Sequence, residues 1–167
     1  MPLRPGRCDR RVKRPYTRKE YIKGPPDPKI RVFVGGSWDK DFEYALTIVA
    51  DADIVVRSNA LEALRVLTMK TFDKQIGSEN YKYQVRAYPH HIIRKHALAG
   101  VHKAERLQKG MRLAFGRPEV AGAIVRRGRP ILTVWVNKEH LELAKRLLQR
   151  VKVKVPPPTS VIVERAA

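Results

Sequence analysis

Alternating apolar and polar positions predict β-strands over much of the chain. The alternation has a period of two in residues 82–88, where it turns Tyr83, Val85 and Ala87 toward a core. Residues 30–34 and 151–155 show the same period. Apolar, β-rich runs predict further strands at residues 46–50, 54–56, 92–93, 121–125, 131–136 and 161–163. Gly128 is suited to the positive φ of a hairpin turn over residues 127–130.

Two segments follow the helical period instead. Apolar residues recur at helical spacing over residues 61–72, with Ser58 as the expected N-cap and Gly77 as the expected stop. A second helix is expected to begin at the cap Asn137. Two helices supply too few crossovers for a doubly wound parallel sheet. The predicted fold class is α+β: a mostly antiparallel or mixed sheet of about seven strands with two packed helices.

The chain is expected to form one domain with a basic extension. Residues 1–28 contain six prolines among many arginines and lysines, a composition typical of an extended or disordered segment. Residues 29–167 are expected to form a single α+β domain. A long basic loop is expected to project from it at about residues 100–117.

The charge is strongly positive and unevenly distributed. The chain has 35 Lys and Arg against 16 Asp and Glu, a net charge of +19. Residues 1–31 and 94–130 each carry a net +8, and residues 32–62 carry a net −4. A compact domain with so much like charge is most stable beside a polyanion. The candidate partners are nucleic acid, an acidic membrane surface or an acidic protein.

Two observations bear on the compartment. No apolar run approaches the roughly 20 residues that span a bilayer, and the N-terminus does not resemble a signal peptide. Cys8 is the one cysteine, so no disulfide can form within the chain. We therefore expect a soluble, cytoplasmic protein.

The connection at residues 94–118 is the strongest candidate for a binding segment. Its length of about 25 residues is unusual in a compact domain, and basic residues recur in it every few positions. Gly100, Gly110 and Gly116 would let its backbone approach a partner closely. The interpretation is an arm that contacts nucleic acid, and the alternative is a basic surface helix without a partner.

The sequence offers no convincing catalytic or metal site. Gly110 and Gly116 are not followed by the Gly-Lys-Ser/Thr of a phosphate-binding loop. One cysteine and scattered histidines do not give the paired ligands of a zinc site. Asp51 and Asp53 are better explained as a turn. No cofactor and no metal are expected.

Aromatic residues provide a further clue. Tyr16 and Tyr88 lie beside arginines and are candidates for stacking on bases, although packing is an equal alternative. Trp135 lies inside an apolar run and is expected in the core, and Trp38 lies in a polar loop.

Several motifs together resemble a known family. The chain is similar to ribosomal protein L ten-e of archaea and eukaryotes, the counterpart of bacterial ribosomal protein L sixteen, nearly from end to end. The matching segments are residues 7–8, 15–16, 26–33, 60–63, 85–94, 106–118 and 137–140, of which Gly-Met-Arg-Leu-Ala-Phe-Gly at residues 110–116 is the most specific. The chain stops soon after Val163, without a longer eukaryotic tail, which favours an archaeal-type member.

The resemblance implies a structural constituent of the large ribosomal subunit. It implies contacts with large-subunit rRNA and neighbouring ribosomal proteins, with no membrane and no homo-oligomer. It also implies that the long loop reaches toward the tRNA near the peptidyl-transferase centre. The residues expected on that tRNA side are His102, Lys103, Arg106, Lys109, Gly110, Met111, Arg112 and Arg117.

The remaining basic residues are expected to hold rRNA, mainly through phosphates. They are Arg4, Arg7, Arg10, Arg11, Lys13, Arg14, Tyr16, Arg18, Lys19, Arg86, His90, Arg94, Lys95, Arg126, Arg127 and Arg129. Two alternatives stay open at this point. One is an RNA-modifying enzyme that uses the same basic surface, and the other is a free-standing binder of anionic surfaces.

Overall fold

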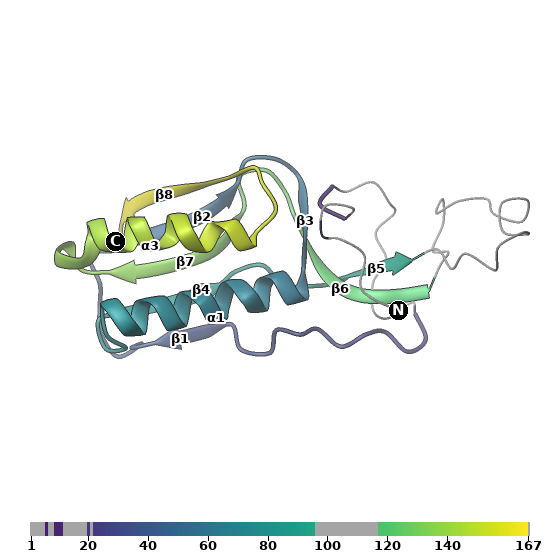
Figure 1. Cartoon of the computed structure of the whole chain (residues 1–167), viewed down its shortest axis with the longest axis horizontal. Coiled ribbons are helices and arrows are strands. Elements are labelled where there is room, and N and C mark those ends of the chain that lie inside the picture. Colours follow the sequence, from purple (N-terminus) through teal and green to yellow (C-terminus); the bar gives the residue numbers. More distant parts are fainter. Residues whose placement is uncertain (1–5, 7–8, 12–19, 21, 96–116, 167) are drawn as a thin grey trace, which may run out of the picture.

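The computed structural model describes residues 6, 9–11, 20, 22–95 and 117–166. Within that part of the chain it has two α-helices and eight strands, and every strand pairing is antiparallel. The predicted α+β class is confirmed. The strands form two sheets rather than one, and Figure 1 shows the smaller sheet extending from one end of the larger.

The larger sheet has five strands in the order β1-β4-β7-β2-β8. Their bounds are β1 Val34–Gly36, β4 Tyr81–Val85, β7 Pro130–Val136, β2 Tyr44–Ala50 and β8 Thr159–Arg165. The smaller sheet has the order β3-β6-β5, with β3 Ile54–Arg57, β6 Arg117–Val125 and β5 His91–Lys95.

Both helices cover the same face of the five-stranded sheet (Figure 1). They are α1 Ser58–Gln75 and α3 Leu141–Val151, and α3 lies between the 3-10 turns Lys138–His140 and Lys152–Lys154. Side chains from helix and sheet meet in one core, which includes Leu46 and Leu132 from the strands and Leu64, Phe72 and Leu148 from the helices. Full burial of such side chains contributes about 1.5–3 kcal/mol each and fixes the helices on this face.

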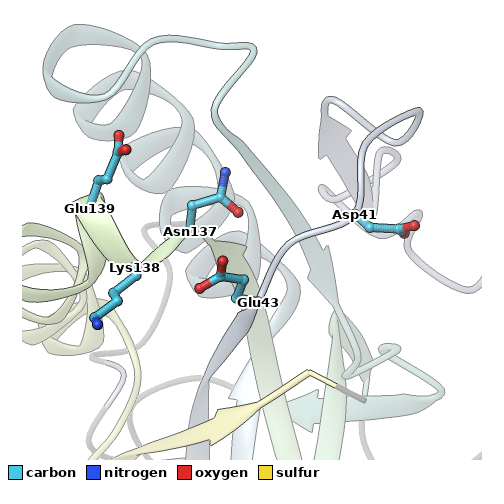
Figure 2. Close-up of a pocket in the computed structure, with 5 residues that line it drawn as sticks. All are labelled: Asp41, Glu43, Asn137, Lys138 and Glu139. Atoms are coloured by element: carbon cyan, nitrogen blue, oxygen red, sulfur yellow. The ribbon is translucent and has the colours of Figure 1, made fainter.

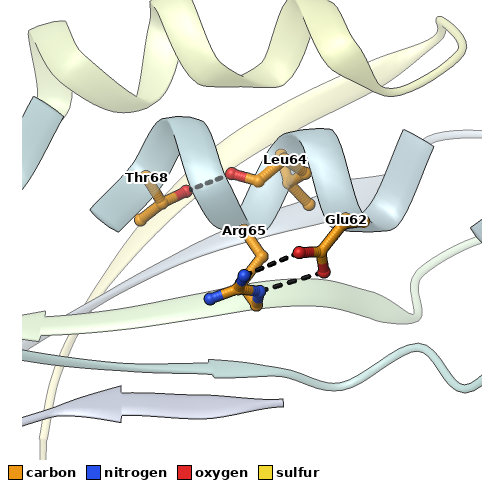
Figure 3. A network of polar contacts seen from close by, with 4 residues as sticks. All are labelled: Glu62, Leu64, Arg65 and Thr68. Carbon is orange, nitrogen blue, oxygen red and sulfur yellow. Dashed lines mark hydrogen bonds and ion pairs between the residues drawn. The ribbon is translucent and has the colours of Figure 1, made fainter. Parts of the chain in front are cut away.

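Two polar side chains of α1, Arg65 and Thr68, form hydrogen bonds within the helix, as Figure 3 shows. The Arg65 guanidinium donates to both carboxylate oxygens of Glu62, at 2.6 and 3.0 Å, and this pairing raises the pKa of Arg65. The buried Thr68 hydroxyl donates to the Leu64 carbonyl at 2.8 Å. The helix therefore packs on the sheet without leaving these groups unpaired.

The strand expected at residues 30–34 is largely wrong. The chain is not in a sheet until Val34, and β1 includes both Gly35 and Gly36. A Cβ on Gly36 would lie 2.3 Å from the Tyr81 carbonyl oxygen, and the φ of Gly36 is +83°. The two glycines therefore allow β1 to lie against β4, and they do not act as a stop signal.

The strand expected at residues 151–155 is also wrong. Val151 ends α3, and residues 152–154 form a 3-10 turn. Val151 and Val155 are buried, whereas Val153 is 76% exposed. Residues four apart lie on the same face of a helix, so the burial of Val151 and Val155 fits the end of a helix. The alternation over residues 151–155 therefore did not indicate a strand.

The turn around Gly128 is confirmed, but the hairpin is wrong. Gly128 has φ +78°, and the Arg129 N–H donates to the Arg126 carbonyl at 3.1 Å. The flanking strands β6 and β7 nevertheless belong to different sheets. Pro89 has a similar place, because it separates β4 of the larger sheet from β5 of the smaller. Local sequence marks the bend correctly without identifying the pairing partner.

Both helices begin at residues other than those expected, whereas α1 ends just before Gly77, as expected. Ser58 is the first residue of α1 rather than its cap, and its buried hydroxyl has no hydrogen-bond partner within the described residues. Asn137 precedes a 3-10 turn and makes no side-chain cap hydrogen bond, and α3 begins only at Leu141. Gly77 follows α1 with φ +90°, and its N–H donates to the Phe72 carbonyl, as a helix-ending glycine should.

Candidate nucleic-acid interface

Three exposed arginines gather on the turn between β6 and β7. The turn carries Arg126, Arg127 and Arg129, and it is tied to the end of β2: Gly128 N–H donates to the Ala50 carbonyl at 2.8 Å. The Ala50 N–H donates in turn to the Arg129 carbonyl at 3.2 Å. Three cations are therefore held on a backbone fixed to the larger sheet.

Asp53 orders one side of this turn. Its carboxylate accepts hydrogen bonds from the Arg127 backbone N–H at 2.9 Å and from Arg126 Nη1 at 2.8 Å. These two donors, the backbone N–H first, lower the pKa of Asp53 below its ordinary value. Arg126 is thus partly neutralised, whereas the side chains of Arg127 and Arg129 form no ion pair with a carboxylate of the described residues.

The start of the chain is anchored beside β3. Asp9 forms an ion pair with Arg57, and both side chains are buried. The Arg10 carbonyl accepts a hydrogen bond from the Val55 N–H at 3.1 Å. Arg10 and Arg11 are exposed next to this anchor. Because β3 pairs with β6, these cations belong to the same end of the molecule as the arginine turn.

The two ends of the long connection lie side by side. The register pairs Lys95 at the end of β5 with Arg117 at the start of β6. Lys95 also lies 3.8 Å from a carboxylate oxygen of Glu119, and Arg117 is exposed. Residues 96–116, which join these ends, are outside the described residues, as is all of the tRNA-side set except Arg117.

Arg94 does not lie on this surface. It is 1% exposed, the largest fully buried side chain within the described residues. It lies on β5, where His91, Ile92 and Ile93 are buried as well, so this strand does not show the exposed face of an alternating strand. Its expected contact with rRNA stays a prediction, and within the described residues the side chain lies in the interior beside the smaller sheet.

Arg86 and His90 are exposed on a different surface. Arg86 Nε donates to the Thr133 hydroxyl at 3.1 Å, and its guanidinium lies 5.8 Å from the Trp135 ring. The Tyr88 ring lies 4.5 Å from His90 and is stacked on Phe33 at 5.3 Å. Tyr88 therefore packs against neighbouring rings, which was the alternative to stacking on a base, while 49% of its side chain stays exposed.

One aromatic cluster on the same surface was not predicted from the sequence. Trp135 is half-buried, outside the core where it was expected, and it meets Trp38 edge to face at 5.8 Å. Lys82 Nζ lies 5.4 Å from the Trp38 ring and 5.7 Å from the Trp135 ring. Val134 and Val136 are fully buried. Because successive side chains of a strand point to opposite faces, the residue between these two valines, Trp135, points outward.

The remaining rRNA candidates lie outside the described residues. They are Arg4, Arg7, Lys13, Arg14, Tyr16, Arg18 and Lys19.

Acidic residues collect at the opposite end of the larger sheet. Figure 2 shows an open pocket lined by Asp41, Glu43, Asn137, Lys138 and Glu139. Glu43 and Asn137 precede and follow the paired residues Tyr44 and Val136, so the pocket lies where β2 begins and β7 ends. Phosphates would be repelled there, so a nucleic acid is better accommodated toward the arginine turn.

The described residues contain no cluster of histidine, cysteine or carboxylate side chains suited to hold a metal ion. No described helix has the length and apolar character needed to cross a membrane. The exposed cations on ordered backbone, together with exposed aromatic rings, are features of a nucleic-acid-binding protein.

Comparisons with known proteins define the class more closely. The family model "Ribosomal protein L16p/L10e" matches residues 11–162. The relative named "Large ribosomal subunit protein uL16" from Archaeoglobus fulgidus is 45% identical over 99% of this chain and 95% of its own. The relative of the same name from Hyperthermus butylicus is 44% identical over 96% of this chain and 93% of its own length. The relative of that name from Saccharolobus solfataricus is 45% identical over 93% of this chain and 89% of its own length.

The molecule is therefore a ribosomal protein of the archaeal type, structural and not enzymatic. It belongs to the ribosomal protein L16p/L10e family. The expected resemblance is confirmed, and the alternative of an RNA-modifying enzyme is set aside.

Proposed function

We propose that this protein is built into the large ribosomal subunit of the cytoplasmic ribosome, where it binds large-subunit rRNA and neighbouring ribosomal proteins. The observation that carries the proposal is the ordered arginine turn at residues 126–129, which lies at the same end as the anchored Arg10 and Arg11. Cations on fixed backbone bind phosphates at a lower entropic cost than cations on a free segment.

Phosphate contacts position a protein on RNA, and the shape of A-form RNA supplies most of the discrimination. In the proposed arrangement Arg127 and Arg129 bind phosphates directly. Arg126 contacts the RNA while it keeps its ion pair with Asp53. The basic extension, from Arg4 to Lys19, continues this contact from the anchor at Asp9.

We further propose that the connection after Lys95 serves the tRNA side. Its two ends are paired strands of the smaller sheet, so the segment begins and ends at one place on a rigid base. A segment held in this way can be changed without loss of the surface that binds rRNA. The two roles are therefore separable by mutation.

The test is the replacement of Arg106, Lys109 and Arg112 by alanine in the full chain. We expect the variant to co-sediment with large subunits in high salt as the parent does, but to impair tRNA accommodation and translation. Loss of incorporation, with normal activity in the few particles that assemble, would contradict this division. Failure of the parent chain to co-sediment would contradict the proposed function as a whole.

A further inference from the structure

The face of the five-stranded sheet turned away from the helices is partly exposed within the described residues, although Thr133 on this face is 3% exposed. Its outward positions on β1, β4 and β7 are here called the open face. They are Val34, Lys82, Gln84, Thr133 and Trp135, continued beyond β4 by Arg86 and Tyr88. Burial alternates from Tyr81 to His90 although the pairing of β4 ends at Val85, so these outward residues form one row.

The order of side chains along this row has a chemical meaning. The Trp38 and Trp135 rings lie at one end, and the stacked rings of Phe33 and Tyr88 lie at the other. Lys82 is paired with Trp135 in the register, and the Arg86 guanidinium lies 5.8 Å from the same ring, so both cations lie beside Trp135. From Lys82 to Tyr88 the row covers six residue steps, about 20 Å at the rise of a β-strand.

The rings at both ends are accessible. Trp38 is 45% exposed and is held by a hydrogen bond from its Nε1 to the Gly35 carbonyl at 3.2 Å. Tyr88 is held by stacking on Phe33 and by the His90 ring, whose centroid lies 4.5 Å from its own, and 49% of its side chain is exposed. A ring whose orientation is fixed and whose outer side is open offers a flat surface on which a base can stack.

The charges favour a polyanion over a basic protein. The Lys82 ammonium donates to the Lys40 carbonyl at 3.3 Å, and neither Lys82 nor Arg86 forms an ion pair with a carboxylate of the described residues. None of the outward positions on β1, β4 and β7 is acidic. Glu164 lies on β8, which is separated from β7 by β2. The acidic pocket includes Asn137, two residues after Trp135, so Arg86, which lies just beyond β4 and further from the pocket along this row than Lys82 does, is the cation better placed for a phosphate.

We propose that the open face is a second RNA-binding surface, on which unpaired nucleotides of rRNA stack on Trp38 and Tyr88 and place phosphates on Lys82 and Arg86. This inference rests on the proposed function, because it takes rRNA as the partner. It adds recognition of unpaired bases to the phosphate contacts of the arginine turn. Bases splayed from a loop or bulge expose the flat surfaces that such rings bind.

The test uses the full chain carrying Trp135→Phe, so that Trp38 is the one tryptophan, and deproteinised large-subunit rRNA as the probe. We expect rRNA binding to quench Trp38 fluorescence, because a stacked base lies against the indole. Trp38→Leu should weaken binding about fivefold or more, as loss of one stacked base does. Trp38→Phe keeps a ring and should stay within about twofold of the parent.

The cations are tested by the double variant Lys82→Gln and Arg86→Gln, with Lys70→Gln and Lys74→Gln on α1 as a control of equal charge change. The first pair should flatten the salt dependence by roughly one to two units, and the control should leave it unchanged. Tyr88→Leu gives an independent test at the other end of the row.

The inference is overturned if the parent binds rRNA with a steep salt dependence while Trp38 is not quenched and Trp38→Leu binds as Trp38→Phe does. That result leaves the proposed function standing. Absence of any binding by the parent chain overturns both.

Discussion

Two glycines with similar backbone angles differ in what surrounds them. Gly36 and Gly128 have φ of +83° and +78°. A Cβ on Gly36 would lie 2.3 Å from the Tyr81 carbonyl oxygen, whereas nothing lies within 4 Å of the corresponding position on Gly128. An alanine substitution at Gly128 therefore tests backbone strain alone, and one at Gly36 tests the same strain together with a steric clash.

Gly128→Ala should lower the free energy of unfolding by about 1–2 kcal/mol, the cost of the left-handed conformation alone. Gly36→Ala should cost about 2–5 kcal/mol, because overpacking against β4 adds to the strain. Urea denaturation of the two variants measures both values. Equal losses would show that β1 can move away from β4 at little cost.

Asp53 provides a prediction for acid pH. Its pKa is lowered from 3.8, first by the Arg127 backbone N–H and then by Arg126. Arg126→Ala should therefore raise the pKa of Asp53 only part of the way, since the backbone donor remains. An NMR titration of the carboxyl group follows this, and a complete return to 3.8 would assign the shift to Arg126 alone.

The sign of the stability effect follows from the direction of the shift. A lowered pKa in the folded state means that Asp53 stabilises the fold above its unfolded pKa, near 4, and that this contribution is lost as the pH falls through the folded value. The turn that presents Arg127 should therefore become less ordered only in acid, and rRNA binding near neutral pH should not be affected.

At the scale of elements, periodicity predicted most strands and both helices, but not the sheets to which they belong. Residues 121–125 and 131–136 read as a hairpin because they are close in sequence, and they separate into β6 and β7 of different sheets. Pairing depends on contacts between distant segments, such as β4 with β7, which local pattern does not contain. The valines at 151 and 155 were misassigned because two residues four apart suit both an alternating strand and a helix end.

The candidate site was also predictable only in part, because local sequence does not contain the contacts between distant segments. The charge pattern identified the arginines of the turn, which are exposed as expected. Sequence did not reveal that Arg94 is buried, nor that Trp38, in the loop after β1, meets Trp135 on β7. Both depend on tertiary geometry.

The anchor of the N-terminal extension is the element with the most direct test. Asp9→Ala would leave the buried Arg57 without its carboxylate and should cost about 3–5 kcal/mol. The Val55 amide, which donates to Arg10, should then exchange its hydrogen faster than the amides of β7. Glu79→Ala breaks the exposed pair with Lys40 and should cost less than about 1 kcal/mol, which makes it a suitable control. Unchanged exchange at Val55 in the Asp9 variant would show that the ion pair does not hold the extension.

At the scale of the whole molecule, charge is separated along the length of the fold. The arginine turn and the anchored Arg10 lie at the end with the smaller sheet, and the acidic pocket lies at the other end of the larger sheet (Figures 1 and 2). A uniform positive surface would bind RNA in many orientations. Separation of charge favours one orientation, with the basic end against phosphates and the acidic end away from them.

The most direct test of the central claim, that the ordered basic end holds rRNA, is the salt dependence of binding to large-subunit rRNA. It compares the parent with a variant that carries Arg126→Gln, Arg127→Gln and Arg129→Gln, and with a control that carries Lys70→Gln, Lys74→Gln and Lys154→Gln. Both variants lose the same net charge, and the control lysines are exposed on the helical side. The account predicts a steep slope for the parent, a slope flatter by about two units for the arginine variant, and no change for the control. A flat slope for the parent, or equal slopes for the two variants, would contradict it.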